Sequence, residues 1–244
     1  IDSCAFSGCS SLEMVSLAPV IEQIGAEAFK GCESLARLII VPSGDCKIGN
    51  RAFMECSSLP NVILGANISE IGDMAFASTA IESFELPQNT TKIGAAIVAD
   101  NSKLTSLTVN SGNMHFDSRD ECNAIIRTAD NALVAGSNVT KIPETVTSIA
   151  DYAFYEACEM DSVIIGNSVK HIGNEAFNYC IKLQKVSLGN SVETIGMGAF
   201  WNCINLKELI SKNDTPPTFA SSSIFADQDI FMKCKVYVSN EAYE

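Results

Sequence analysis

Cysteine gives this 244-residue chain its largest stock of reactive side chains, because ten are present. Thiols form disulfides, bind zinc or act as nucleophiles, yet the sequence contains no CxxC pair and no Cys/His group with zinc spacing. Five cysteines instead recur three residues after a phenylalanine: Cys9, Cys32, Cys56, Cys180 and Cys203. Other copies of this slot hold Thr79, Asn101 or Ala157, which indicates a ladder of small, buried, reduced side chains. Disulfides between neighbouring rungs are the alternative, since Cα separations of about 5 to 6 Å permit them.

The other five cysteines lie off the ladder, and the sequence does not predict their redox state. They are Cys4, Cys46, Cys122, Cys158 and Cys234.

The only two histidines offer little for acid–base or metal chemistry. His171 occupies a slot that Glu70 and Thr194 fill in other repeats, so we expect a solvated surface side chain. His115 stands beside Phe116, without a recognisable catalytic partner. The sequence therefore predicts no catalytic residue and no cofactor, and we expect the protein not to be an enzyme.

An acidic loop is the one candidate for a cation. Asp117, Asp120 and Glu121, with Asp130 nearby, supply carboxylate oxygens of the kind that calcium prefers. A calcium cage needs about six to eight oxygen ligands and usually a glycine to shape its loop, and neither is evident here. We therefore predict a solvated loop and no metal site, with calcium binding as the alternative.

The ladder cysteines belong to a nine-residue phrase that recurs along the chain, as in IGAEAFKGC from Ile24, IGNRAFMEC from Ile48, IGNEAFNYC from Ile172 and IGMGAFWNC from Ile195. Each copy leads into a Leu-x-x-Val-x-Leu type of pattern, and the period is about 23 residues. The phenylalanines are Phe6, Phe29, Phe53, Phe76, Phe154, Phe177 and Phe200, with Val98 in their place once. Such a period predicts a solenoid of about nine turns, each burying its apolar edge against its neighbours. The phenylalanines are expected to stack in the core.

One repeat indicates how a turn is built. In LQKVSL, Leu183, Val186 and Leu188 alternate with Lys185 and Ser187, as in a short half-buried strand. Stacked strands of this kind form a parallel sheet. The apolar spacing of Ala-Phe-x-x-Cys suits one helical or 3₁₀ turn. The predicted fold class is therefore α/β, a parallel-sheet coil with short helical or 3₁₀ turns.

We expect a single domain over 1–244. Two stretches within it interrupt the period. Repeats cover 1–109 and 139–212, and the inserted segment 110–138 contains two short strands, Ala124 to Arg127 and Ala132 to Ala135, that read as a hairpin. This hairpin is expected to protrude from the coil or to replace one turn. Residues 213–244, in which Val236 and Val238 alternate, are expected to form the cap that a terminal repeat requires.

Charge and hydropathy exclude several classes of partner. With 29 acidic and 16 basic residues, the net charge of −13 disfavours nucleic acid. No apolar run approaches the 18 or so residues of a membrane helix. Ile1 stands at the Ile position of a repeat already under way, so we expect a mature fragment or part of a longer chain.

The recurrent IGxxAFxxCxxLxxVxL pattern, the FDSRDECNAIIRTADNALVAG insertion and the PP…YV ending resemble the BspA-like leucine-rich repeat family of bacterial surface proteins. The resemblance extends over nearly the whole chain. It implies a curved leucine-rich repeat coil, a location on the cell surface or outside the cell, and adhesion to or recognition of host or matrix proteins. It implies no catalytic residues.

The outward positions of the strands supply the candidate binding face. Ile39 and Ile63 are expected to stand side by side with Val41 near them, and an exposed apolar group ringed by polar residues suggests a protein-binding patch. The full candidate face is Arg37, Ile39, Val41, Asn61, Ile63, Ile164, Lys185 and Ile210. The alternative is that β-branched residues here simply favour strands.

We therefore expect a non-enzymatic surface module that binds host or matrix protein through the strand face, with the inserted hairpin as a second candidate surface. The sequence does not predict the oligomeric state. One alternative is a structural spacer within a larger surface protein. A carbohydrate-binding module is a weaker alternative, because it needs aromatic platforms and Trp201 is the only tryptophan.

Overall fold

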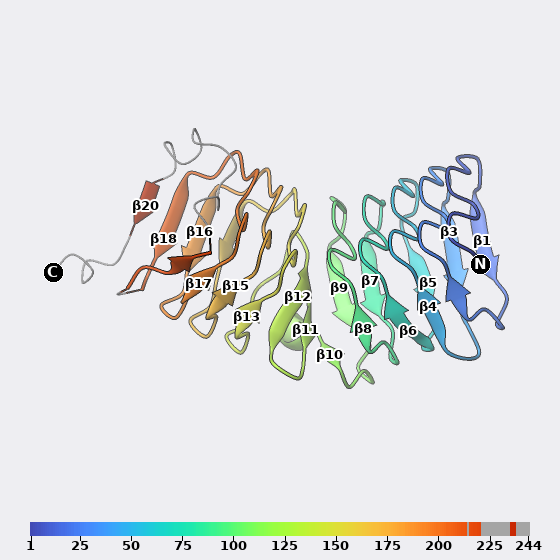
Figure 1. The fold of residues 1–244 in the computed structure, drawn as a ribbon, viewed down its shortest axis with the longest axis horizontal. Coiled ribbons are helices and arrows are strands. Elements are labelled where there is room, and N and C mark those ends of the chain that lie inside the picture. The colour runs from blue at the N-terminus through green and yellow to red at the C-terminus, as the bar shows by residue number, and fades with distance from the viewer. Residues whose placement is uncertain (214, 221–234, 238–244) are drawn as a thin grey trace. The chain divides into compact units, whose positions relative to one another are not determined.

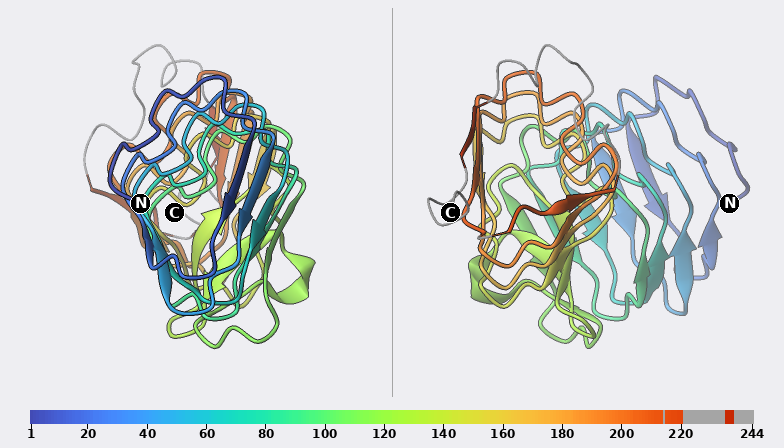
Figure 2. Two further views of the ribbon diagram at one scale, coloured as in Figure 1. Left: turned by 90° about the vertical axis from the view of Figure 1, so that its right-hand side faces the viewer. Right: turned by 60° about the vertical axis from the view of Figure 1, so that its left-hand side comes forward.

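The computed structural model describes residues 1–213, 215–220 and 235–237, and the chain forms two compact units, Ile1–Ser118 and Arg119–Glu244. Each unit is a coil of short parallel strands, with about nine turns in the whole chain (Figure 1). Figure 2 shows the turns of each unit stacked one behind another. The predicted parallel-sheet solenoid is therefore confirmed.

The first unit carries strands on two sides of the coil. One side holds β1 (Met14–Leu17), β3 (Arg37–Ile40) and β5 (Val62–Leu64), followed by β7 (Ser83–Leu86) and β9 (Ser106–Val109). A parallel bridge between Asn61 and Ser83 continues the stack from β5 to β7. The second side holds β2 (Gln23–Ile24), β4 (Cys46–Ile48), β6 (Ile68–Ile71) and β8 (Lys92–Ile93), and β10 (Phe116–Asp117) follows β9.

The second unit repeats this arrangement. Its first side holds β14 (Ser162–Ile164), β16 (Lys185–Leu188), β18 (Glu208–Ser211) and β20 (Lys235–Tyr237), all parallel. Its second side holds β11 (Ala124–Arg127), β12 (Ala132–Gly136), β13 (Ser148–Ile149), β15 (His171–Ile172), β17 (Thr194–Ile195) and β19 (Thr218–Phe219). As predicted, Leu183, Val186 and Leu188 face inward, whereas Lys185 is exposed.

The predicted hairpin is present and takes the place of a turn. Strands β11 and β12 pair antiparallel, and β12 then pairs in parallel with β13, so the hairpin continues the sheet. Ile125, Ile126 and Leu133 are fully buried, and only the tip around Arg127 and Asp130 is exposed. The alternative of a protruding arm is therefore wrong, because the apolar strands need the coil to cover them.

The phenylalanine ladder is confirmed with one exception. Neighbouring rings are parallel, as in Phe29 and Phe53 with centroids 5.2 Å apart and Phe177 and Phe200 at 5.3 Å. The ladder rings from Phe29 to Phe200 are buried. Val98, which takes the place of a phenylalanine in one repeat, is also buried, with 6% of its surface exposed. Phe6 is 44% exposed, so its predicted burial is wrong. Its ring stacks on Phe29 alone, with centroids 5.1 Å apart.

The turns that carry the phenylalanines are not helical, which corrects the α/β expectation. In each turn the residue before Ala and the residue before the Cys slot have positive φ, as at Glu27 (57°), Arg51 (55°) and Glu175 (50°). This alternation sends every second amide to the next turn: Glu27 N–H donates to Asn50 O at 2.9 Å, and Phe29 N–H to Ala52 O at 2.8 Å. A helix would direct these bonds along its own axis. Among the described residues the one 3₁₀ helix is Arg119–Glu121.

The glycine after each repeated isoleucine lets neighbouring turns approach closely. A Cβ on Gly49 would lie 2.6 Å from Ala26 N, and one on Gly196 would lie 2.5 Å from Asn174 N. At the end of the ladder in the second unit, Gly136 serves a related purpose. A Cβ there would lie 2.1 Å from Phe154 Cε1, so the glycine leaves space for this ring.

The predicted cap, 213–244, lies mainly outside the described residues. Within it, β20 includes Val236 and pairs with β18, whereas Val238 and Cys234 lie outside the described part of the chain.

Candidate binding face

The first unit brings an apolar pair to its outward strand face. Ile39 on β3 and Ile63 on β5 are Cα partners in the parallel register, so they are direct neighbours. Ile63 is 52% exposed and Val41, just after β3, is 49% exposed, while Ile39 is half-buried. The alternation of inward leucines with outward isoleucines follows from the pleat of a strand, because successive side chains point to opposite faces.

Polar residues border this pair. Arg37 at the start of β3 is exposed, and Asn61 lies beside Ser83, whose hydroxyl is 3.4 Å from Asn61 Oδ1. Met14 on β1 is the Cα partner of Arg37 and is 55% exposed. Sequence reasoning missed Met14 at the edge of the patch, although its outward position in the first repeat was a usable signal.

The remaining three predicted residues lie on the second unit and form a more polar face. Ile164 on β14 is 71% exposed, but Ser187 separates it in register from the half-buried Ile210 on β18. Lys185 Nζ forms a salt bridge with Glu208 at 3.1 Å. The structure therefore groups Arg37, Ile39, Val41, Asn61 and Ile63 on one unit and Ile164, Lys185 and Ile210 on the other.

The ladder cysteines act as hydrogen-bond donors inside the coil. The thiol of Cys56 donates to Phe29 O at 3.3 Å, and that of Cys180 donates to Phe154 O at 3.2 Å. Asn101 fills the slot in the same way, since its Nδ2 donates to Phe76 O at 2.9 Å. Cys32, Cys56, Cys180 and Cys203 are buried and form no disulfide, whereas Cys9 is exposed, contrary to the expected burial of the whole ladder.

Burial also suppresses the reactivity of two ladder thiols, Cys56 and Cys180. Desolvation raises the pKa of Cys56 to about 12 and raises the pKa of Cys180 well above its usual range. Because the thiolate is the reactive form, these cysteines are poor nucleophiles and poor metal ligands. Their arrangement serves packing and backbone hydrogen bonding.

The two histidines and Asp130 of the acidic loop lie on the protein surface. His171 Nδ1 lies 2.9 Å from Thr194 Oγ1 on the exposed side of β15, and His115 is exposed. Asp130 forms a two-pronged pair with Arg127, which lowers the pKa of the Asp130 carboxyl. Within the described ranges, no three His, Cys, Asp or Glu side chains are grouped to hold a metal ion.

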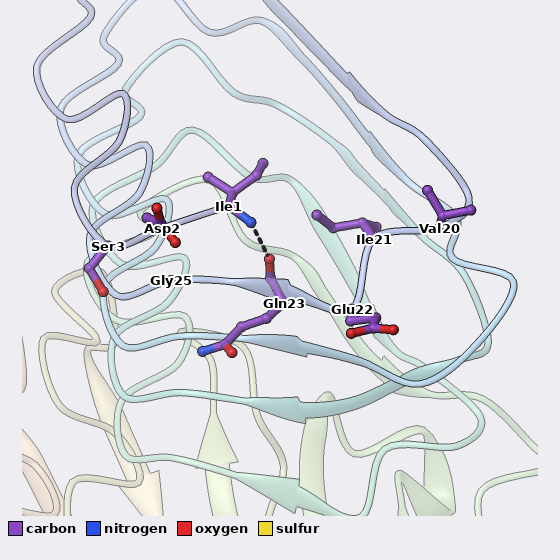
Figure 3. A pocket seen from close by; sticks show the side chains of 8 residues that line it. All are labelled: Ile1, Asp2, Ser3, Val20, Ile21, Glu22, Gln23 and Gly25. Atoms are coloured by element: carbon purple, nitrogen blue, oxygen red, sulfur yellow. Dashed lines mark hydrogen bonds between the residues drawn. The ribbon is translucent and has the colours of Figure 1, made fainter.

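Two hollows of the first unit lie beside its first turn and its second sheet. Figure 3 shows one beside the first turn, where the Ile1 amino group donates to Gln23 O at 2.8 Å. Another is lined by Gly49, Gly72 and Gly94 and by Lys47 and Glu70, which form a salt bridge at 2.6 Å. Neither holds a nucleophile beside a base, so neither suggests a reaction.

The repeat and its coil define a leucine-rich repeat protein. The family model described as BspA type Leucine rich repeat region matches residues 1–105 and 135–236 with six copies. The match covers well over half of the chain, which therefore belongs to this family. No curated protein matches the chain, and none of the helices in its described part has the length and apolarity needed to cross a bilayer.

Solved structures of bacterial leucine-rich repeat proteins share the fold. A leucine rich cell surface protein from Faecalibacterium prausnitzii is 24% identical, with a TM-score of 0.67, and the match covers 85% of this chain and 63% of that one. The pneumococcal vaccine antigen PcpA is 25% identical, with a TM-score of 0.72 and coverages of 90% and 54%. A leucine-rich repeat protein from Eubacterium ventriosum is 17% identical, with a TM-score of 0.67 and coverages of 95% and 67%. The chain thus spans less than two thirds of the length of the first two.

Proposed function

We propose that this chain is a non-enzymatic recognition module of the cell surface, which binds host or matrix protein through the outward strand face of its first unit. The observation that carries the proposal is the in-register pair of Ile39 and Ile63 with Val41 beside it. Exposed apolar groups rimmed by polar residues are typical of protein-binding surfaces. Membership of a repeat family and the surface location named for the Faecalibacterium protein support the same proposal.

The charge of the chain indicates the kind of partner. A net charge of −13 favours partners with a basic surface around an apolar centre, because opposite potentials speed encounter and orient the partners. We therefore expect binding to weaken as ionic strength rises.

A double substitution tests the face directly. Ile39→Glu with Ile63→Glu places two charges on the apolar pair, and immobilised purified extracellular-matrix and host surface proteins serve as probes. The double variant is expected to lose binding to every probe that the unaltered chain binds. The stability change is expected to stay within about half a kcal/mol per site, because outward surface positions tolerate substitution.

The matched control places the same charge on exposed apolar residues outside the strands. Val20 and Met114 are each 81% exposed, so Val20→Glu with Met114→Glu adds equal charge without altering the face. This control is expected to bind as the unaltered chain does. Equal binding by both double variants contradicts the proposed face, and no binding of any probe by the unaltered chain favours the structural spacer.

A further inference from the structure

Four aromatic side chains lie at one corner of the second unit, beside the ladder phenylalanines of three successive turns. Tyr152 and Tyr155 flank Phe154, Tyr179 follows Phe177 by two residues, and Trp201 follows Phe200. Tyr179 and Trp201 are each 44% exposed, while Tyr152 and Tyr155 are half-buried. We call these four residues the aromatic corner.

The fold itself does not require aromatic residues at these positions. In the first unit, the positions directly after the ladder residue hold Ser7, Lys30, Met54, Ala77 and Ala99. The next positions hold Gly8, Gly31, Glu55, Ser78 and Asp100. The turns of the two units have the same alternating φ pattern, so the aromatic corner is an addition to the repeat and has no evident role in building it.

The rings are held in a fixed arrangement. Tyr152 and Tyr155 pack edge to face with centroids 5.7 Å apart, and Tyr155 and Tyr179 do so at 6.2 Å. Trp201 packs against Gly198, with its Cε3 atom 3.4 Å from the place that a Cβ would occupy. Edge-to-face pairs at such distances are attractive, so the aromatic surface is largely formed before any ligand arrives.

A chain of polar groups runs across the same three turns. The Tyr152 hydroxyl donates to Glu175 Oε1 at 3.2 Å, and Asn178 Nδ2 donates to Glu175 Oε2 at 2.9 Å. Asn202 Nδ2 then donates to Asn178 Oδ1 at 3.3 Å. Burial raises the pKa of Tyr155 to about 12 and also raises that of Tyr152, so both hydroxyls stay protonated near neutral pH.

Flat apolar rings beside amides, hydroxyls and a carboxylate match the two surfaces of a sugar. A pyranose presents C–H groups on one face and hydroxyls around its rim, and aromatic side chains with a polar end suit such mixed surfaces. The turns repeat about every 4.8 Å, so the surface can contact successive units of an extended chain. Glu156 and Glu175 give the corner negative charge, which disfavours acidic sugars.

We propose that the aromatic corner, with Glu175 and Asn202 beside it, binds an uncharged glycan chain. The buried amide of Asn178 holds these two side chains in place. This site is separate in sequence and in residues from the strand face of the first unit. The glycan-binding proposal can therefore be tested separately from the proposed protein-binding function.

The single tryptophan makes the site directly measurable. Because Trp201 is the only tryptophan, its fluorescence reports on the corner alone. The probes are soluble uncharged polysaccharides, namely hydroxyethyl cellulose, laminarin and galactomannan, and the hexamer of N-acetylglucosamine. At least one is expected to shift Trp201 emission saturably and to retard the protein in affinity electrophoresis.

Substitutions distinguish specific binding at this site from non-specific adsorption to the protein surface. Tyr179→Ala keeps the tryptophan reporter and is expected to raise the dissociation constant by about ten-fold or more. Tyr179→Phe keeps the ring and is expected to bind nearly as the unaltered chain does. Ile39→Glu with Ile63→Glu is expected to leave glycan binding unchanged, and circular dichroism checks that each variant is folded.

Three results would overturn the proposal. One is the absence of any emission shift or retardation with all four probes. Another is unaltered affinity in Tyr179→Ala. The third is a response confined to polygalacturonate or to polylysine, which would assign the corner to an acidic glycan or to a basic polypeptide.

Discussion

At the scale of single residues, the cysteines of the Cys slot have a second role besides filling volume. Cys56 and Cys180 are small enough for the core, yet each also donates to the phenylalanine carbonyl of the preceding turn. A buried carbonyl benefits from such a donor because water cannot reach it. The occupant Asn101 follows the same rule, since it donates to Phe76 O.

We predict that the protein loses stability in alkaline solution as these thiols ionise. The pKa of Cys56 is about 12 in the folded chain against an ordinary value of 9.0. Between these values the unfolded thiol gives up its proton and the folded one keeps it, so the free energy of unfolding falls as pH rises. Cys56→Ser keeps a donor and removes the ionisable group, so its urea midpoint is expected to fall less steeply between pH 8 and pH 10.5.

The buried ladder was predictable from the sequence, but its hydrogen bonds were not inferred. The common spacing of the cysteines indicated small buried residues, and that is confirmed for Cys32, Cys56, Cys180 and Cys203. The exchange of Cys for Asn101 was a signal for a donor as well as for volume. If Cys56→Ser shows the same pH dependence as the unaltered chain, the shifted thiol of Cys56 is not a source of it.

At the scale of elements, the strands were predictable and the turns were not. Alternation identified the inward leucines, and the hairpin strands were expected at Ala124 to Arg127 and Ala132 to Ala135, close to β11 and β12. The Ala-Phe-x-x-Cys spacing fits both a helical turn and the observed turn. Left-handed residues such as Glu27 and Arg51 carry no sequence signal, because they are not glycine.

The aromatic corner was not inferred from the sequence, where Trp201 was considered only as an isolated platform. A helical turn would also bring Tyr152 and Tyr155 to one face, because they are three residues apart. The contact that depends on the stacking of turns is the one between Tyr155 and Tyr179 of the next repeat. The outward strand residues were easier to find, because a strand exposes every second side chain.

We predict that the glycine slot is required for the spacing of the turns. Gly49→Ala would bring its Cβ within 2.6 Å of Ala26 N, which is backbone and cannot move aside easily. The expected loss is about 1–3 kcal/mol or more in the free energy of unfolding measured with urea. Gly44→Ala is the matched control, since no heavy atom lies within 4 Å of its added Cβ. Equal stability of the two variants contradicts this account of the slot.

At the scale of the whole molecule, the coil has no single core. Each ring of the ladder packs on rings of adjacent turns, as Phe177 does on Phe154 at 4.8 Å and on Phe200 at 5.3 Å. Stability in such a chain is close to a sum of terms for each turn and for each pair of neighbouring turns. A local defect is therefore expected to have effects that fade along the stack.

We predict that truncating a central ring weakens mainly its own region. Phe177→Ala removes a fully buried ring with a neighbour on each side, so it is expected to cost about 3–5 kcal/mol of local stability. Phe6→Ala is expected to cost less, because Phe6 is 44% exposed and stacks on one ring only. Native-state hydrogen exchange measures both effects turn by turn.

The pattern of exchange distinguishes neighbour-by-neighbour stability from one cooperative core. In Phe177→Ala, amides of β15 and β16 and of the turns around Phe154 and Phe200 are expected to exchange much faster. Amides of β3 and β4 in the first unit are expected to keep their protection, because the ring of Phe177 stacks on those of its own neighbouring turns, Phe154 and Phe200. A uniform loss of protection through both units would instead mean that the chain opens as one body, and stability would then have to be assigned to the molecule and not to its turns.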